Sequence, residues 1–295
     1  MEFIDLKTQY EKLKPEIDAG IQKILDHGQY IMGPEVREFE QQMSEYLGVK
    51  HAIACANGTD ALQLLFMAYG IGEGDAVFTS DITFISSVEP ACMLGATPVF
   101  CDIDERTYNI SPESLEKQIK AVIADGKLTP KIVVAVDILG NPADFDEIEK
   151  VCKKYDLILM EDAAQSFGAE YKGKKCCSFG HSAMTSFFPA KPLGCYGDGG
   201  AIFTEDDELA EVLKSLIVHG KGPAGKYNNI RIGVNSRLDT IQAAILIAKL
   251  KAFKDYEMDK RQEVANYYSE AFKEHFVTPY IPSDALSAWA QYALL

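Results

Sequence analysis

The sequence predicts an α/β fold in which a mainly parallel sheet is sandwiched between helices. Up to about residue 205, short apolar runs alternate with amphipathic stretches of helical period. Strict alternation of strands and helices implies right-handed crossovers, which place neighbouring strands parallel to one another. At 295 residues the chain can bury a large core, so we expect one large domain followed by part of a second, smaller one.

Two helices are expected before the first strand, at Gln9–Asp26 and Glu35–Tyr46. The expected strands are short apolar runs: His51–Ala56, Ala76–Thr79, Thr97–Cys101, Ile132–Val136 and Leu157–Met160. The helices expected between them are Asp60–Tyr69, Ile85–Leu94, Ser111–Ala121 and Phe145–Tyr155. Ser111 followed by Pro112 is a strong helix start, because serine caps the first turn and proline has no N–H to leave unpaired.

After the sheet region the pattern becomes mainly helical. One helix is expected at Asp206–His219 and a long one from about Leu238 to Phe276, before two prolines break the pattern. Ser287–Leu295 is expected to begin a strand. We therefore expect a large domain over residues 1–250. Residues 251–295 would then hold a long linking helix and the beginning of a small C-terminal domain that is truncated here.

Charge and composition argue against several classes of function. Lys and Arg number 29 against 44 Asp and Glu, and a net charge of −15 argues against a nucleic-acid-binding surface. A local cluster of cations could still oppose this overall charge and hold an anionic small molecule. The N-terminus lacks the pattern of a signal peptide and no apolar stretch is long enough to span a membrane. We therefore expect a cytoplasmic protein that contacts no membrane.

The cysteines predict reduced thiols and no metal site. They number seven and include no C-x-x-C pair, and an odd number does not suit a disulfide framework. Cys176 and Cys177 are adjacent, which makes them a poor pair of zinc ligands.

Lys191 is the most informative residue for the chemistry. It stands between Pro189 and Pro192 and just before the glycine-rich run Gly194–Gly200, a poor setting for a solvated helix face. We interpret it as an amine held at a fixed point, as Schiff-base chemistry requires.

An acidic pair, Glu161 and Asp162, directly follows the apolar run Leu157–Met160. Taken alone, Asp162 could be a helix cap or a metal carboxylate, and such pairs are usually caps or turns. The residues that follow favour a different role for Asp162, because Gln165 comes about one helical turn later and Lys191 lies downstream. An aspartate at the end of a buried strand, together with a fixed lysine, is the pairing that pyridoxal phosphate (PLP) requires. The lysine holds its aldehyde and the carboxylate keeps its ring nitrogen protonated.

Gly58, Thr59 and Phe84 lie just after expected strands, at the edge where parallel sheets bind ligands, and Ser186 comes five residues before Lys191. Gly58 and Thr59 open a helix after the first strand, so their N–H groups could meet a phosphate, although taken alone a plain helix cap is the better explanation. Ser186 could add a hydroxyl to the same phosphate. Phe84 could stack on a flat ring or could be a core aromatic.

Two downstream segments are ambiguous. Gly220–Tyr227 matches a P-loop except at its last position, where tyrosine replaces the serine or threonine that would hold magnesium, and it follows a helix rather than a strand. We reject it as a nucleotide triphosphate site. Asn235 and Arg237 open the long helix as either a cap with a solvated arginine or an anion contact, two readings that we leave open.

Taken together, these motifs resemble the PLP-dependent nucleotide-sugar aminotransferases of fold type I, the DegT-type family. The residues that carry the resemblance are Phe3–Leu6, Gly33–Glu40, Asn57–Leu62, Gly95–Asp102, Glu161–Gly168, the Lys191 run, Gly199–Thr204 and Gly233–Asp239. They cover essentially the whole chain in order, which is far more specific than any one motif.

The resemblance implies a role for each candidate residue. Lys191 would hold PLP and move the proton between the substrate carbon and the cofactor. Asp162 would face the ring nitrogen, Gln165 the ring hydroxyl, and Phe84 would stack on the ring. Gly58, Thr59 and Ser186 would contact the phosphate. In this family the residue at Asn235 reaches the phosphate of the neighbouring subunit's cofactor, which implies a homodimer with shared sites.

The resemblance also implies a substrate class. His27–Pro34 and Phe187–Gly200 look most similar to members that aminate C3 of a UDP-N-acetyl-3-oxo-hexuronate with L-glutamate, for surface polysaccharide such as lipopolysaccharide. Arg237 would then be a candidate for the substrate's anionic groups. The alternatives are an aminotransferase acting at C4 of a 4-oxo-6-deoxy nucleotide sugar and a PLP-binding regulatory protein without catalysis. The family's His-Tyr-Pro substrate segment would come after Leu295.

Overall fold

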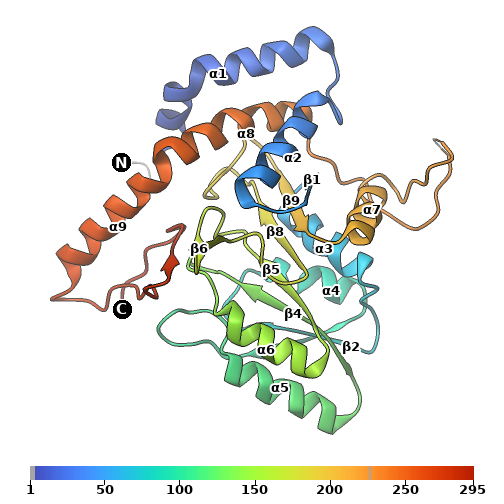
Figure 1. Ribbon diagram of the computed structural model, residues 1–295, viewed down its shortest axis with the longest axis vertical. Helices are drawn as coiled ribbons and strands as arrows, with labels where there is room; N and C mark the ends of the chain where they lie inside the picture. Colours follow the sequence, from blue (N-terminus) through green and yellow to red (C-terminus); the bar gives the residue numbers. More distant parts are fainter. Residues whose placement is uncertain (1–3, 226) are drawn as a thin grey trace.

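The computed structural model describes residues 4–225 and 227–295. Phe3, which begins one motif of the family resemblance, and Lys226, the lysine of the rejected P-loop match, lie outside the described residues. The described residues form a seven-stranded sheet in the order β1-β9-β8-β5-β4-β2-β3 and a three-stranded sheet in the order β10-β6-β7. Figure 1 shows the larger sheet at the centre of the molecule, with α1 and α8 at one end and α5 and α6 at the other.

The larger sheet is mainly parallel, as the sequence predicts. Its strands are β1 (His51–Cys55), β2 (Asp75–Ser80), β3 (Thr97–Cys101), β4 (Thr129–Val136), β5 (Ile158–Asp162), β8 (Ser182–Ser186) and β9 (Gly200–Thr204). β2 pairs in parallel with β3 and β4, and β5 pairs in parallel with β4 and β8. Only β9 runs against its neighbours, β8 and β1. The sequence pattern does not predict β8 and β9, because glycine, serine and threonine interrupt their apolar residues.

Helices occupy the places expected of them, with small changes at their ends. They are α1 (Leu6–His27), α2 (Pro34–Leu47), α3 (Gly58–Ala68), α4 (Glu89–Met93), α5 (Pro112–Asp125), α6 (Phe145–Tyr155) and α7 (Asp207–Leu216). The helix expected at Ile85–Leu94 is instead a 3₁₀ turn, Ile85–Ser87, followed by the short α4. Pro90 explains the break, since proline is tolerated only in the first turn of a helix and therefore starts a new one.

The long helix expected near the C-terminal end is also present. It consists of α8 (Thr240–Ala252), a π-helical turn at Phe253–Glu257 and α9 (Met258–Phe272). In Figure 1 these segments form one orange rod that crosses above the sheet and continues away from it. The helix begins at Thr240 rather than Leu238, because Asp239 is the N-cap.

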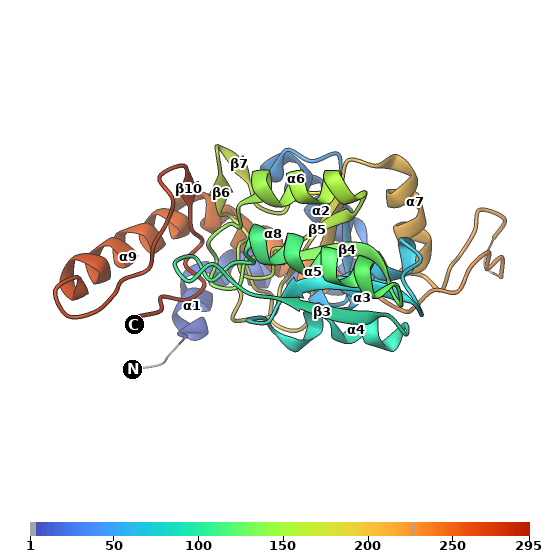
Figure 2. The same ribbon diagram turned by 90° about the horizontal axis from the view of Figure 1, so that it is seen from below.

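Alternate residues of each central strand face different layers of helices. In β4, Ile132, Val134 and Val136 belong to the core beneath α3 and α7, whereas Val133 and Ala135 belong to the core beneath α5 and α6. A third core lies between the sheet, α2 and α8. Figure 2 shows the two layers, with α2 and α6 above the sheet and α3 and α4 below it. Burial on both faces is what a parallel sheet requires.

The C-terminal segment corrects one expectation. The chain forms the short strand β10 at Ala285–Leu286, which pairs with β6 (Glu170–Tyr171), beside β7 (Lys174–Lys175). Ser287–Leu295 does not form the strand that the sequence suggests. The amide of Ala288 and the hydroxyl of Ser287 both donate to the carbonyl of Gly140, at 2.8 and 2.9 Å, and this contact turns the chain out of the sheet.

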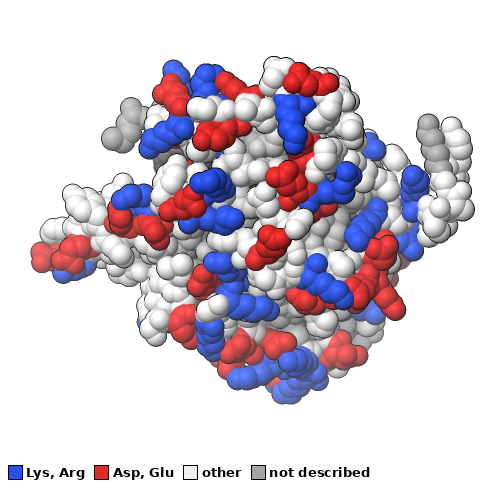
Figure 3. All heavy atoms as spheres, turned by 45° about the horizontal axis from the view of Figure 1, so that its top comes forward, with Lys and Arg blue, Asp and Glu red and all other residues white. Residues whose placement is uncertain are grey.

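Two further observations concern thiols and membranes. The seven cysteines are all free thiols in the structure. Among the residues that the structure describes, no helix is long and apolar enough to cross a bilayer. Figure 3 shows cationic and anionic side chains interspersed over one face of the molecule.

Candidate active site

The residues proposed from the sequence gather at one edge of the larger sheet. Asp162 is the last residue of β5 and Ser186 the last residue of β8, and these strands are parallel. β1 also ends at this edge, because two antiparallel pairings, through β9, give it the direction of β8. Gly58 and Thr59 follow β1 at the start of α3. The carboxyl edge of the strands is where open α/β sheets bind ligands.

Lys191 lies in the tight return between β8 and β9. The return is closed at its base by Phe187, whose amide donates to the carbonyl of Gly199 at 2.7 Å, while the Lys191 amide donates to the Phe188 carbonyl at 2.8 Å. A Cβ at Gly194 would come within 2.5 Å of the Pro189 carbonyl oxygen, so only glycine fits there. The lysine backbone is therefore held in place, as the sequence predicts.

The Lys191 amine contacts the glutamine that was predicted to accompany it. Its Nζ donates to Oε1 of Gln165 at 3.1 Å. Burial lowers the pKa of Lys191, and the charge of Asp162 opposes this shift only in part. A lowered pKa favours the neutral amine, which is the nucleophilic form that attacks an aldehyde.

Asp162 is a buried carboxyl group with polar contacts on both oxygens. Its Oδ2 accepts a hydrogen bond from the Ser87 hydroxyl at 3.0 Å, and its Oδ1 accepts one from the Ala164 amide at 3.2 Å. Burial raises the pKa of Asp162, while the two hydrogen bonds and the charge of Lys191 lower it. A cationic ring N–H placed against this carboxyl group would be stabilised, and would in turn favour the ionised acid. The site therefore fits the ring nitrogen of PLP.

Ser87 is a functional candidate that the sequence reasoning missed. It ends the 3₁₀ turn after Phe84, and its hydroxyl also contacts the Thr83 hydroxyl at 2.8 Å. A serine three residues after a candidate aromatic gives no recognisable signal in the sequence. Ser87 reaches Asp162 because the connection between β2 and α4 passes over the end of β5, and only the three-dimensional structure shows this contact.

The start of α3 lies against the end of β8. A Cβ at Gly58 would come within 2.8 Å of Ser186 Cβ, so the helix approaches the strand more closely than any other residue would allow. Asn57 caps the Asp60 amide at 2.8 Å. The N–H groups of Gly58 and Thr59 precede the hydrogen-bond ladder of the helix and remain available to a phosphate. The structure thus brings together three of the four residues that the sequence assigned to phosphate binding.

Phe84 lies on the connection that carries Ser87, as the residue before the 3₁₀ turn. Its side chain is 66% exposed, so it is a surface aromatic and not the core residue that was the alternative. An exposed ring at this point can stack on a flat ligand, and its role in stacking on the cofactor stays a prediction.

Asn235 and Arg237 flank Ser236, whose hydroxyl accepts a hydrogen bond from the Ala56 amide at 3.1 Å, two residues before Gly58. They do not open the long helix but belong to the extended segment before it, where Asn235 forms an isolated bridge with Val218. The Arg237 guanidinium donates to the Asn235 side chain. Among the described residues, no hydrogen bond or ion pair joins either of them to Lys191 or Asp162. Their roles in phosphate and substrate binding stay predictions.

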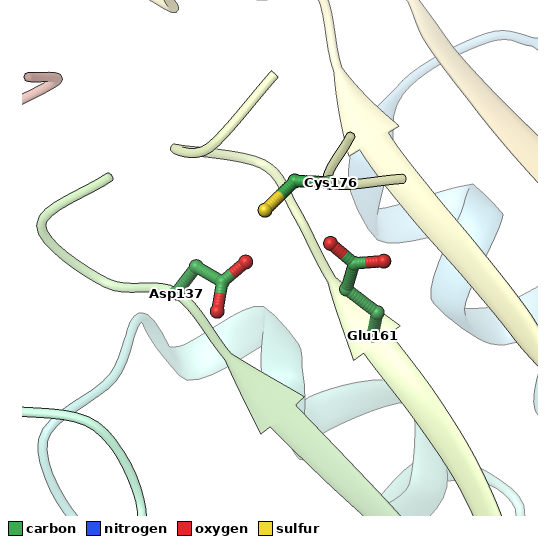
Figure 4. Close-up of side chains that lie close together, drawn as sticks. All are labelled: Asp137, Glu161 and Cys176. Carbon is green, nitrogen blue, oxygen red and sulfur yellow. The ribbon is translucent and has the colours of Figure 1, made fainter. Parts of the chain in front are cut away.

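A second acidic cluster lies behind the site. Figure 4 shows Asp137, Glu161 and Cys176 pointing toward one another, and their possible ligand atoms all lie within 4.8 Å. The four carboxylate oxygens already accept hydrogen bonds, from Ala143 N and Ser166 Oγ at Asp137 and from Cys177 N and Phe179 N at Glu161. Burial raises the pKa of Asp137 to about 7 and also raises that of Glu161. The two acids therefore hold a proton at a pH at which exposed carboxylates have lost theirs.

The rejected P-loop match is a projecting loop. It follows α7, as expected, and Figure 1 shows this loop extending from the side of the molecule beyond α7. The amide of Gly222 donates to the Asn228 carbonyl at 2.6 Å, and Tyr227 is 87% exposed. No strand leads into this loop, so its context differs from that of a P-loop.

Comparison with known proteins places this arrangement in a family. Residues 11–295 match the model of the DegT/DnrJ/EryC1/StrS aminotransferase family. The chain is 50% identical over 297 residues to the UDP-2-acetamido-2-deoxy-3-oxo-D-glucuronate aminotransferase of Pseudomonas aeruginosa, an alignment that covers 100% of this chain and 79% of that protein.

Solved structures agree with this match. A DegT/DnrJ/EryC1/StrS aminotransferase from Brucella abortus superposes with a TM-score of 0.98 at 50% identity, over 100% of this chain and 78% of that one. NtdA from Bacillus subtilis, with bound cofactor PMP, superposes with a TM-score of 0.86 at 27% identity, over 96% of this chain and 63% of that one. The chain therefore belongs to the DegT/DnrJ/EryC1/StrS aminotransferase family and is an enzyme that uses pyridoxal phosphate.

Proposed function

We propose that the protein transfers the amino group of L-glutamate to C3 of a UDP-N-acetyl-3-oxo-hexuronate and so makes an amino-sugar nucleotide for surface polysaccharide, lipopolysaccharide among them. The observation that carries the proposal is the contact between the Lys191 amine and Gln165, at 3.1 Å, next to buried Asp162. The choice of sugar is supported by the 50% identity to the Pseudomonas aeruginosa enzyme.

Each residue of the site would have a separate role in the reaction. PLP, when bound, supplies an aldehyde and an electron-accepting ring. Lys191 would hold the aldehyde carbon and afterwards move a proton to or from the substrate carbon, for which its lowered pKa suits it. Asp162 would hold the proton on the ring nitrogen, and Ser87 would orient that carboxylate. Gly58, Thr59 and Ser186 would bind the phosphate.

We also propose that the active unit is a homodimer with shared sites. Several large apolar residues are exposed, namely Tyr30, Ile31, Phe84, Ile85 and Ile232, and Phe84 and Ile85 belong to the turn that carries Ser87. Exposed apolar groups concentrated in one region are typical of a protein interface. Asn235 lies three residues after Ile232 and is exposed, so it is free to reach a phosphate in a second subunit. Arg237, two residues after Asn235, would bind an anionic group of the substrate.

Because nucleotide sugars and glutamate are cytoplasmic metabolites, we place the enzyme in the cytoplasm.

A substrate comparison tests this function. Purified protein loaded with PLP is given L-glutamate and either a UDP-N-acetyl-3-oxo-hexuronate or a 4-oxo-6-deoxy nucleotide sugar, and the amino sugar formed is measured by mass spectrometry. The proposal expects turnover of the first ketone and a kcat/KM for the second that is lower by at least about a hundredfold. Preference for the 4-oxo sugar would overturn the assignment of the carbon. Binding of PLP without turnover of glutamate would overturn the enzymatic function.

A further inference from the structure

A cleft of about 570 Å³ opens directly beside Lys191. Its walls come from the beginning of α1, the loop that carries Lys191, α9 and the segment near Trp289. Figures 1 and 2 show the start of α1 next to α9 and the C-terminal segment, so parts of the chain that are distant in sequence enclose it. Of the candidate cofactor residues, Lys191 lines the cleft, whereas Asp162, Gly58 and Ser186 do not.

Cations dominate the lining of this cleft, although the chain as a whole carries a net charge of −15. Besides Lys191, which would hold PLP, the basic residues that line it are Lys12, Lys249, Lys260 and Arg261, and the acidic ones are Asp5 and Glu257. Both carboxylates already have partners. Asp5 caps α1 by accepting from the Thr8 amide at 2.9 Å, and Glu257 accepts from Gln9 Nε2 at 2.9 Å. Lys260 is paired with Glu263 at 2.6 Å, whereas in the described part of the chain no ion pair holds Lys12, Lys249 or Arg261, so an anion entering the cleft would meet unpaired positive charge.

Lys249 is the most unusual of these cations. It lies on α8 and is 2% exposed, yet among the described residues no hydrogen bond or ion pair reaches its amine. Its Nζ lies 5.0 Å from the centre of the Tyr196 ring, and Glu257 attracts it only from a distance. Burial lowers the pKa of Lys249 to about 8. Burying a lysine without a partner is costly, and an anionic ligand would remove that cost.

Arg261 fixes the same region to the catalytic loop. Its guanidinium donates to the Pro192 carbonyl at 3.3 Å and to the Trp289 carbonyl at 3.4 Å. Pro192 follows Lys191 directly, so Arg261 joins the loop that holds the reactive amine to the wall of the cleft. Trp289 and Tyr292 add stacked rings, with centroids 5.6 Å apart.

We propose that this cleft binds the anionic part of the nucleotide-sugar substrate, its diphosphate or uronate carboxylate, with Lys249 as the opposing charge and the reacting carbon turned toward Lys191. The inference rests on the proposed function. The volume favours the nucleotide sugar over glutamate, because pockets of several hundred Å³ enclose ligands larger than an amino acid. Lys249 is thus a specificity-determining residue, and the rings of Trp289 and Tyr292 offer a surface for the flat base.

Calorimetric titration of the PLP-loaded enzyme with UDP-glucuronate tests the proposal, because this sugar lacks the ketone and cannot react. Lys249→Met is expected to weaken binding by at least about tenfold, the loss of one charged contact, and to leave the visible absorption of bound PLP unchanged. Lys249→Arg should restore most of the affinity. Lys251→Met, two residues away on the same helix with a 77% exposed side chain, is the matched control and should bind like the wild type. Equal affinities for the wild type and Lys249→Met would overturn the proposal.

Two more measurements distinguish the nucleotide sugar from glutamate as the ligand of the cleft, and a loss of binding from a loss of folding. A rise in the KM for L-glutamate alone, with unchanged binding of UDP-glucuronate, would assign the cleft to the amino donor and contradict our assignment. If Lys249→Met does not fold, acylation of the wild-type amine at pH 8 can be followed by mass spectrometry. UDP-glucuronate should then protect Lys249, and absence of protection would count against the proposal. An enzyme that binds UDP-glucuronate but transaminates no 3-oxo sugar would refute the proposed function and leave the cleft assignment standing.

Discussion

The amine of Lys191 and the amide oxygen of Gln165, 26 positions apart in sequence, are joined by a hydrogen bond of 3.1 Å across the carboxyl edge of the sheet. Lys191 comes from the return between β8 and β9, whereas Gln165 comes from the turn after β5. The contact therefore depends on the parallel pairing of β5 with β8. It links the residue that would react to the residue that would orient the cofactor.

Replacing Lys191 with alanine tests the reactive amine. Lys191→Ala should abolish the visible absorption band of bound PLP and lower kcat by at least about a hundredfold, because it removes the amine that would hold the aldehyde and move the proton at the substrate carbon. Absorption spectroscopy and a glutamate-dependent assay measure the two effects. An unchanged spectrum in the variant would contradict the assignment of Lys191.

A methyl group at Gly58 should close the phosphate site. In Gly58→Ala the added Cβ would lie 2.8 Å from Ser186 Cβ, and we expect the Kd for PLP to rise by about tenfold or more, equal to about 1.4 kcal/mol. Fluorescence titration of the apoenzyme measures it. Combining Gly58→Ala with Ser186→Gly removes the clash and should recover part of the loss that steric crowding causes.

A second glycine provides the control for that experiment. Gly72 has no positive φ, and a Cβ there would come no closer than 3.6 Å to another atom. Gly72→Ala should therefore bind PLP normally. If both alanine variants lost affinity equally, the close approach of α3 to β8 would not be the cause.

Ser87→Ala should make Asp162 harder to ionise. The Ser87 hydroxyl lowers the pKa of Asp162, so its loss should raise that pKa and move the acid limb of the pH–kcat profile to higher pH. A hydrogen bond to a charged group contributes about 1.5–3 kcal/mol, and we expect kcat at neutral pH to fall by roughly tenfold. Ser86→Ala is the matched control, because its side chain makes no such contact with Asp162; a shifted profile there would refute the specific role.

The buried acids Asp137 and Glu161 should make the fold less stable as pH rises. The native state keeps the Asp137 proton up to about pH 7, whereas an unfolded aspartate loses it near pH 4. Between these values the native state binds more protons than the unfolded state, so the free energy of unfolding should fall with pH, by at most about 1.4 kcal/mol per pH unit for one proton.

Urea unfolding of the apoenzyme between pH 4.5 and 8 measures that slope. Asp137→Asn keeps the size of the side chain and removes the titrating group, so the curve should become flatter over this range. A variant with the same slope as the wild type would show that another group is responsible.

Much of the fold and site follows from the sequence, and the exceptions have physical causes. Local signals predict α5 and α6, because the Ser111–Pro112 start of α5 and the apolar spacing of both helices are contained within a few turns. The same holds for the central strands, which are buried on both faces and therefore continuously apolar. β9 is not predicted from the sequence. Gly200–Thr204 becomes a strand because it pairs with β8 and β1, whose hydrophobic surroundings lie elsewhere in the chain.

The site shows the same division. Lys191, Asp162 and Gly58 are found because each stands at a break in the pattern, after a strand or between prolines. The sequence does not point to Ser87 or Lys249. Ser87 donates a hydrogen bond to a carboxylate 75 positions away, and Lys249 lies within an apolar helix in which a lysine is not expected. Such residues are recognised only when the fold shows what they face.

The alternation of β5 separates two acids that are neighbours in sequence. Asp162 lies on the same side of the strand as Met160 and meets Ser87, whereas Glu161 lies on the side of Leu159 and meets Asp137. A slip of β5 by one residue against β4 and β8 would exchange them. The hydrogen-bonded register of the sheet, with Glu161 opposite Ala135 and Asp162 opposite Val136, thus selects which of the two acids faces Ser87 and would serve the cofactor, and which one is paired with Asp137.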